Sequence, residues 1–212
     1  MEITLQGLDS LPRAVGKTAE DTAKAIERAT VRSLNRVADR TATLSRRDIA
    51  AQINLTQRYI RAQMEVKKAS RQRQVAEIRA RLRAVRMARF DARQVTERAP
   101  DARAAGDPLR KIAKGRKAAG VSVKIARGNA RTSRRAGFLI PLRAGAVDGG
   151  NGMGLFVRTG RGRTAIEHKY GPSPDQLFRR WAARPQNEKL IADLLEETFS
   201  NQIRHELTGS RS

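Results

Sequence analysis

The sequence predicts an α+β fold, with a long N-terminal helix packed on a small antiparallel sheet, extended arms or loops, and helices at the C-terminal end. Small and apolar residues recur at three- and four-residue steps across 12–53, as on the buried face of a helix. Apolar residues alternate along 138–142 and 155–157, as in half-buried strands. Ser173 and Pro174 then form a typical helix start. A length of 212 residues fits a single domain over 1–212.

The expected first helix is unusually long. At about 40 residues it exceeds the globular average, which predicts either one continuous spine or a break near Ser45–Asp48. Asn54, with Gln57 three residues later, resembles a capping box and predicts a short helix over 55–62.

Two strands and an arm are expected next. The strands are 64–67 and 76–84, and the second would place Ile78 and Leu82 on an apolar face opposite a row of arginines. A helix is the alternative for 76–84. Residues 91–118 are polar and lack a period, so we expect an extended arm or loop that orders against a partner.

The rest of the chain alternates between strands and helices. A strand is expected at 121–125, and a glycine-rich loop over 145–154 would join the two alternating runs described above. Pro185 is expected to end one helix and Asn187 to cap the last one. The tail, 208–212, is expected to be disordered.

Charge is the strongest global property. The net charge is +23, and basic residues concentrate in the middle of the chain while both ends are nearly balanced. Such a field favours polyanions or acidic protein surfaces as partners. Hydrophobic residues make up 39% and aromatic residues 4%, so the core is lean and part of the apolar surface should be covered by partners. No cysteine occurs, and no apolar run approaches the ~20 residues that span a bilayer, so disulfides and a membrane location are not expected.

Residues suited to catalysis are scarce. His168 stands beside Glu167, which would suit acid–base chemistry, but a strand-end histidine on a polar face is the simpler interpretation. The glycine-rich runs 149–152 and 160–163 match no phosphate-binding template. They are expected to be exposed turns, with 160–163 equally suited to be a basic loop that settles on a partner. We expect no enzyme activity, no metal site and no cofactor.

Arginine and lysine runs are the serious candidates for binding. Such side chains contact phosphates independently of sequence, although a charged face is often merely solvated. The aromatic residues that would stack on single-stranded bases are scattered along the chain. The candidate contacts to DNA or to an acidic partner are Arg79, Arg81, Arg83, Arg131, Arg134, Arg135, Arg158, Arg161 and Arg163.

Several ordered features together resemble the minor tail protein Z family of long-tailed bacteriophages and prophages. The similarity covers nearly the whole chain, and the asparagine–arginine pair of the first helix and the run Leu155-Phe156-Val157-Arg158-Thr159-Gly160-Arg161 are the most telling. The other features are the segments 29–38, 54–61, 66–69, 121–124, 138–141, 154–161 and 166–173.

This resemblance implies a structural virion protein at the head-proximal end of the tail, acting in tail maturation, head–tail joining and DNA positioning at the neck. It also implies assembly in the host bacterial cytoplasm as a homo-oligomeric ring, expected to be six-fold. The implied partners are the tail terminator, the tail tube, the head–tail connector and packaged DNA. The charge by itself supports an alternative, a free sequence-nonspecific nucleic-acid-binding protein.

Overall fold

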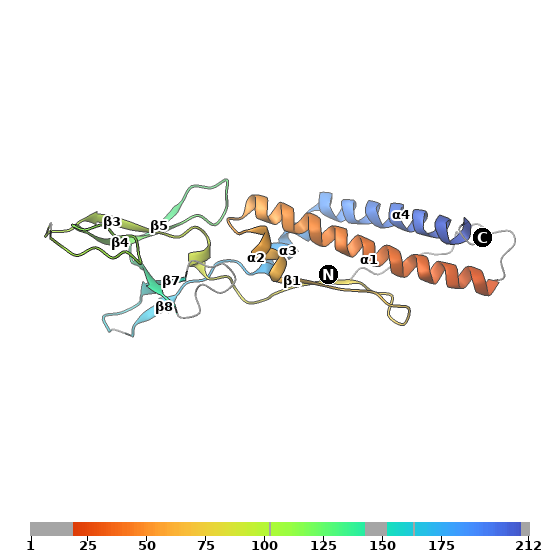
Figure 1. Cartoon of the computed structure of the whole chain (residues 1–212), viewed down its shortest axis with the longest axis horizontal. Coiled ribbons are helices and arrows are strands. Elements are labelled where there is room, and N and C mark those ends of the chain that lie inside the picture. The colour runs from red at the N-terminus through yellow and green to blue at the C-terminus, as the bar shows by residue number, and fades with distance from the viewer. Residues whose placement is uncertain (1–18, 102, 143–151, 163, 209–212) are drawn as a thin grey trace. The chain divides into compact units, whose positions relative to one another are not determined.

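The computed structural model describes residues 19–101, 103–142, 152–162 and 164–208 (Figure 1). The predicted α+β class is confirmed, with three small antiparallel sheets in place of the single one expected. Contacts divide the chain into two compact units. Unit 1 comprises 1–47, 63–81 and 175–212, and unit 2 comprises 48–62 and 82–174. The expected single domain stays a prediction.

Helix α1, Ala19–Gln52, is continuous, so the spine interpretation is correct and no break occurs near Ser45. Its buried face consists of small and aliphatic residues at three- and four-residue steps, among them Ala29, Leu34 and Thr41. This face lets other elements approach closely. Residues 12–18 of the expected helix lie outside the described residues.

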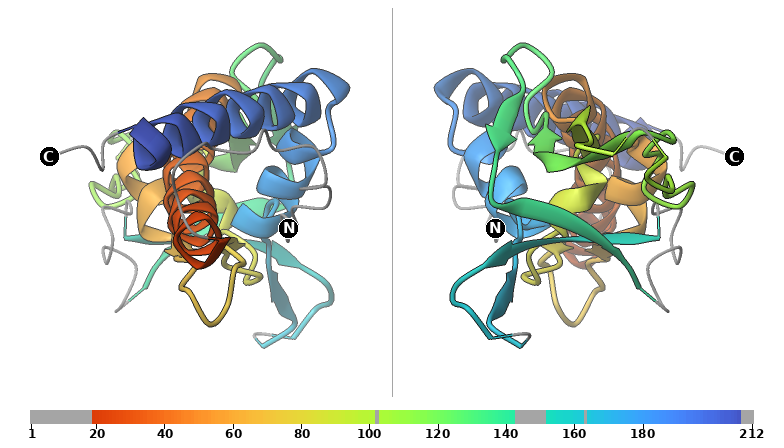
Figure 2. Two further views of the ribbon diagram at one scale, coloured as in Figure 1. Left: turned by 90° about the vertical axis from the view of Figure 1, so that its right-hand side faces the viewer. Right: turned by 90° about the vertical axis from the view of Figure 1, so that its left-hand side faces the viewer.

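Helix α4, Pro185–Thr208, runs antiparallel to α1 within unit 1 and lies beside it (Figures 1 and 2). Glu206, whose side chain is 9% exposed, accepts a hydrogen bond of 2.8 Å from Arg28 and another from Arg32. The long N-terminal helix therefore packs against the C-terminal helix. Thr208 ends α4, so the expected disorder was wrong at residue 208, and the rest of the expected tail, 209–212, lies outside the described residues.

Strands β1, Met64–Lys67, and β2, Glu77–Ala80, form an antiparallel pair in unit 1. Both strands were predicted, but β2 is shorter than 76–84 because the chain leaves the pairing after Ala80. Ile78 is buried as expected, whereas Leu82 is 73% exposed, so its expected place on the apolar face was wrong.

Two helices meet at a proline in unit 1. Helix α3, Pro174–Ala182, begins directly after Ser173, as predicted. Pro185 opens α4 instead of only ending α3, because proline at a first helical position needs no N–H partner. Asn187 is therefore inside α4, and its side-chain amide donates to the carbonyl of Trp181 at 2.7 Å instead of capping the helix.

Helix α2, Gln57–Ala62, belongs to unit 2 and starts later than predicted. The Oγ1 atom of Thr56 accepts the backbone N–H of Tyr59 at 3.2 Å, so Thr56 is the capping residue and Asn54 is not. A short 3₁₀ helix, η1, follows at Met87–Arg89.

The segment 91–118 contains regular structure where a loop was expected. Strand β3, Arg93–Arg98, pairs with β4, Arg116–Val123, which pairs with β5, Thr132–Arg134. Strand β3 lies at the edge of its sheet and is held there by backbone pairing. Its sequence is therefore polar and lacks the alternation of apolar residues by which a strand is predicted. Gly120 is required inside β4, since its φ is 114° and an added Cβ would lie 2.6 Å from a backbone oxygen.

Strands β6, Gly137–Pro141, β7, Met153–Arg158, and β8, Ile166–His168, form the third sheet. Leu139 and Leu155 lie opposite each other and enter the core of unit 2. The predicted strands are confirmed, but the predicted face of β6 was wrong: Phe138 and Ile140 are only half-buried while Leu139 is 5% exposed. The expected glycine loop, 145–154, lies mostly outside the described residues.

A basic pocket and an aromatic ladder in unit 2

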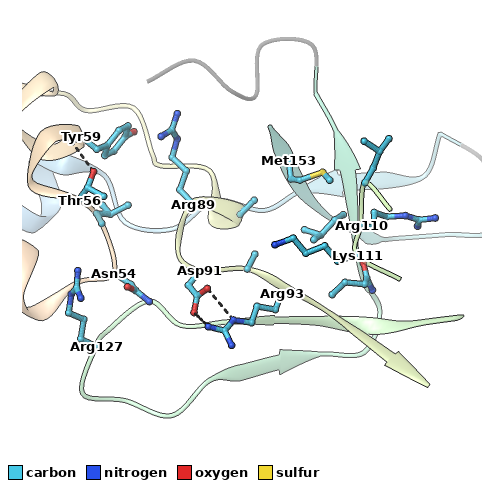
Figure 3. Close-up of a pocket in the computed structure, with 16 residues that line it drawn as sticks. Asn54, Thr56, Tyr59, Arg89, Asp91, Arg93, Arg110, Lys111, Arg127 and Met153 are labelled. Carbon is cyan, nitrogen blue, oxygen red and sulfur yellow. Dashed lines mark hydrogen bonds and ion pairs between the residues drawn. The ribbon is translucent and has the colours of Figure 1, made fainter. Parts of the chain in front are cut away.

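Unit 2 contains a pocket with a volume of about 720 Å³ (Figure 3). Its walls come from the segment before and within α2, from η1 and β3, and from the turn that precedes β4. Five basic side chains and one carboxylate line it, above apolar residues of the core. The charged lining residues are Arg89, Arg93, Arg110, Lys111, Arg127 and Asp91.

The single carboxylate, Asp91, is fully engaged. Arg93 donates to it at 3.2 Å and Arg131 at 2.5 Å. Burial raises the pKa of Asp91, but the hydrogen bonds and charges of these two arginines outweigh burial and lower the pKa below its ordinary value. Asp91 is therefore ionised at neutral pH and committed to arginines.

A closed turn presents Lys111 to the pocket. Asp107 and Ile112 exchange two backbone hydrogen bonds of 2.8 Å, and Arg110 donates to the Asp107 carboxylate at 2.6 Å. Figure 3 shows the Lys111 side chain directed inward, toward the side where Asp91 lies. Its ammonium has no hydrogen-bond or ion-pair partner within the described part of the chain.

Backbone strain concentrates at this pocket. Among the described residues, the non-glycine residues with positive φ are Asp91, at 48°, and Lys111, at 58°. Both line the pocket. Each such residue costs about 1–2 kcal/mol, so the surrounding contacts must hold both in place.

The remaining walls combine cations with apolar surface. Arg127 donates to the carbonyls of Ala50 and Ile53, at 2.9 and 3.3 Å, which leaves its positive charge uncompensated by these contacts. The Arg89 guanidinium lies 4.5 Å above the ring of Tyr59. Leu109 is 68% exposed at the rim.

The structure does not gather the predicted arginines into one site. Arg79 and Arg81 belong to unit 1, where Arg79 pairs with Glu77 at 2.6 Å and Arg81 donates to the Gln63 side chain at 3.0 Å. Arg131 is a structural residue, because it joins Asp91 to Ser122.

Other predicted arginines are exposed in unit 2. Arg158 donates to the carbonyl of Gly162 at 3.2 Å and lies 5.8 Å over the ring of Phe138. The side chains of Arg83, Arg134, Arg135 and Arg161 are exposed and make no hydrogen bond or ion pair with another described residue. Arg163 lies outside the described residues.

An aromatic ladder crosses the third sheet on the face opposite the core. Phe138, Phe156 and His168 are register partners on β6, β7 and β8, and Tyr170 continues the row. The ring centroids are 6.3, 4.5 and 4.4 Å apart in that order. This ladder was not predicted from the sequence, because its members are far apart along the chain and only strand register brings them together.

His168 lies between Phe156 and Tyr170 in this ladder and has a structural role. Burial lowers its pKa first and the charge of Arg86 lowers it further, so the ring is neutral at pH 7. Glu167 lies on the other face of β8 and pairs with Lys169 at 2.5 Å. The acid–base pair considered from the sequence therefore does not form, and the expected polar face is an aromatic one.

A comparison with protein families gives the decisive observation. The model of the family described as "Prophage minor tail protein Z (GPZ)" matches residues 7–210. The chain belongs to this family. Neither the curated proteins nor the solved structures gave a match. The resemblance expected from the sequence is confirmed, and the chain is a phage tail protein.

Two features that carried the resemblance have a physical role in the structure. Asn35 of α1 makes two hydrogen bonds to the backbone of Ala69, donating at 3.1 Å and accepting at 2.7 Å. Residues 155–158 of the run 155–161 belong to the central strand β7, and Leu155 is fully buried. These residues hold the fold and do not form a reactive site.

Within the described part of the chain, no helix has both the length and the hydropathy to cross a membrane. No three His, Cys, Asp or Glu residues there are grouped in a way that could hold a metal ion.

Proposed function

We propose that this protein is a non-enzymatic structural component of the tail that completes its head-proximal end. It acts in tail maturation, in head–tail joining and in positioning DNA at the neck, and it is assembled into the virion in the host cytoplasm. The match of the family over residues 7–210 carries this proposal. The lean core supports it, because a chain that leaves leucines such as Leu82 and Leu109 exposed gains stability from neighbours.

The proposed assembly is a homo-oligomeric, six-fold ring that contacts the tail terminator, the tail tube and the head–tail connector. Copies of a chain with a net charge of +23 repel one another, so such a ring needs acidic partners or DNA at its surface. The exposed cations of unit 2 would supply many weak contacts, which a ring multiplies.

The test is genetic and structural. Deleting the gene from the phage or prophage that encodes it should yield heads and tails that fail to join, or tails of irregular length, in electron micrographs. Wild-type protein supplied from a plasmid should restore intact particles. Mass spectrometry should detect the chain in purified particles and immunogold should label the neck. Absence from intact particles would overturn the proposal.

DNA contact is a separable part of the proposal. Arg83, Arg134, Arg135 and Arg161 are exposed and extend into solvent, as phosphate-binding arginines must. The logarithm of the DNA affinity should fall steeply as the logarithm of the salt concentration rises. Changing Arg134 and Arg135 together to Gln should make that slope shallower by about two. An unchanged slope would remove these two residues from the DNA interface.

The alternative, a free sequence-nonspecific nucleic-acid-binding protein, is favoured only by the charge. The aromatic ladder does not suit single-stranded bases, because Phe156 and His168 each have a ring neighbour on both sides. Open ring faces are what base stacking needs. Tight DNA binding by a protein that is missing from particles would favour this alternative.

A further inference from the structure

We propose that the basic pocket of unit 2 binds an acidic peptide segment of a partner protein. The ligand is an extended stretch in which carboxylate side chains alternate with an aliphatic one. The proposal names the chemistry of one partner contact and rests on the proposed function only for the identity of that partner as another tail protein.

Charge at the pocket selects an anion. The Asp91 carboxylate is already shared by Arg93 and Arg131, and Arg110 is paired with Asp107. The charges of Lys111 and Arg127 are compensated by no carboxylate in the described part of the chain. Carboxylates of a ligand would accept charge-assisted hydrogen bonds from Lys111 and Arg127 and neutralise their charges.

Apolar surface at the same pocket selects an aliphatic group. Leu109 is 68% exposed on one side, and Met153 and Leu139 form part of the wall. Covering Leu109 would remove apolar surface from water, and this burial would stabilise a complex. A leucine or valine of the ligand would cover Leu109 while its neighbouring carboxylates reach Lys111 and Arg127.

The lining favours a peptide over a nucleic acid. A phosphate backbone would use the cations but would leave the aliphatic wall uncovered. The aromatic ring in the lining, Tyr59, is covered by Arg89 on one face. The pocket is also concave, with cations on opposite walls, whereas a nucleic-acid backbone requires a continuous basic track.

The pocket is built before any ligand arrives. The turn 107–112 is closed by two backbone hydrogen bonds, and an added Cβ at Gly106 would lie 2.4 Å from the Ile112 carbonyl oxygen. This packing holds Lys111 in its left-handed conformation. The backbone at Lys111 is therefore already in its binding position and only the side chain remains to be ordered, so affinity gains from preorganisation of the turn.

The experiment measures binding of a fluorescein-labelled peptide, Glu-Leu-Glu-Glu-Leu-Glu, to the full-length protein by fluorescence anisotropy at physiological salt. Lys111→Gln should weaken binding about fivefold, because a directed ion pair is lost. Leu109→Ser should weaken it about as much, because the aliphatic contact is lost. The peptide with every Glu replaced by Gln should not bind.

Matched controls separate the pocket from the general positive field. Lys114→Gln removes the same charge nearby but outside the pocket lining, and Leu82→Ser removes a comparably exposed leucine elsewhere in unit 2. Both should leave peptide affinity within about twofold of wild type, a difference of about 0.4 kcal/mol. Equal losses from Lys111→Gln and Lys114→Gln, or no binding by wild type, would overturn the proposal.

A duplex DNA of random sequence is measured in parallel. The two lysine variants should weaken DNA binding equally, since phosphates respond to the summed charge. A loss of DNA affinity confined to Lys111→Gln would overturn the peptide assignment in favour of DNA. This assay uses purified protein, so peptide binding by a chain that is absent from virions would refute the proposed function and leave the pocket assignment standing.

Discussion

The two units differ in the balance of basic and acidic residues and in how these residues are paired. By sequence, unit 1 has 21 basic and 14 acidic residues, whereas unit 2 has 23 basic and only 7 acidic residues. In unit 1, carboxylates join separate elements, as when Glu206 of α4 binds Arg28 and Arg32 of α1. Among the described residues of unit 2, the side chains of Lys111, Arg134 and Arg135 make no ion pair with a carboxylate.

Backbone strain follows the same division. Among the described residues, the non-glycine residues with positive φ, Asp91 and Lys111, both belong to unit 2 and both line its pocket. Strain and uncompensated charge destabilise a fold, so their presence together is best explained by binding. We therefore interpret unit 1 as organised for stability and unit 2 for contact with an acidic partner.

The largest effect is expected in unit 1 at Asn35. Asn35→Ala leaves the backbone N–H and C=O of Ala69, which is 6% exposed, without their partners. We expect a loss of about 2 kcal/mol in the free energy of unfolding. Urea denaturation followed by circular dichroism measures it. The exposed Asn201 of α4 provides the control, and Asn201→Ala should change stability by less than about 0.5 kcal/mol. Equal losses of stability in the two variants would show that the hydrogen bonds between Asn35 and Ala69 do not stabilise unit 1.

A smaller effect is expected at Glu206. Its hydrogen bond from Arg28 lowers its pKa first, burial opposes this, and the charge of Arg32 lowers the pKa further. Because the folded pKa lies below the ordinary value of 4.5, the stabilisation is complete above that pH and is lost as pH falls through the folded pKa. Glu206→Gln should therefore cost about 1 kcal/mol at pH 7 and progressively less in acid.

The matched control for that pH profile is the exposed Glu197, also on α4. Glu197→Gln should leave the curve of stability against pH close to that of wild type. If Glu206→Gln and wild type lose stability in parallel as the pH falls, the α1–α4 ion pairs do not stabilise unit 1, and the contrast between the units is weakened.

The positions of the helices and strands were predicted from the sequence more accurately than which face of each element is buried. Strand β7 and the start of α3 were found because alternation and a Ser-Pro cap are local signals. The face of β6 was misjudged because Phe138, Leu139 and Ile140 are all apolar, so alternation cannot choose between them. Pairing with β7 makes that choice, and it is a long-range contact.

The pocket could not have been predicted in the same way. Its cations come from separate segments, and Lys111 acts there only because the turn 107–112 closes and reverses the chain. The polar sequence of 91–118 suggested an unpatterned arm, whereas pairing with β4 makes part of it a wall of the site. Charge alone indicated a polyanion or an acidic protein surface as the partner, but not where that partner binds.

The smallest change in the free energy of unfolding is expected at Lys111, where the substitution should stabilise the protein. Lys111→Gly should stabilise the protein by about 0.5 kcal/mol, because glycine relieves left-handed strain that exceeds its own entropic cost. Peptide binding should nevertheless fall, since the ammonium is gone. Lys114→Gly, at a position without positive φ, should destabilise slightly and leave binding unchanged. Urea denaturation and the anisotropy assay measure the two quantities on the same samples. If Lys111→Gly instead destabilises the protein, the lysine stabilises the turn, and strain at the pocket is no longer an argument for binding.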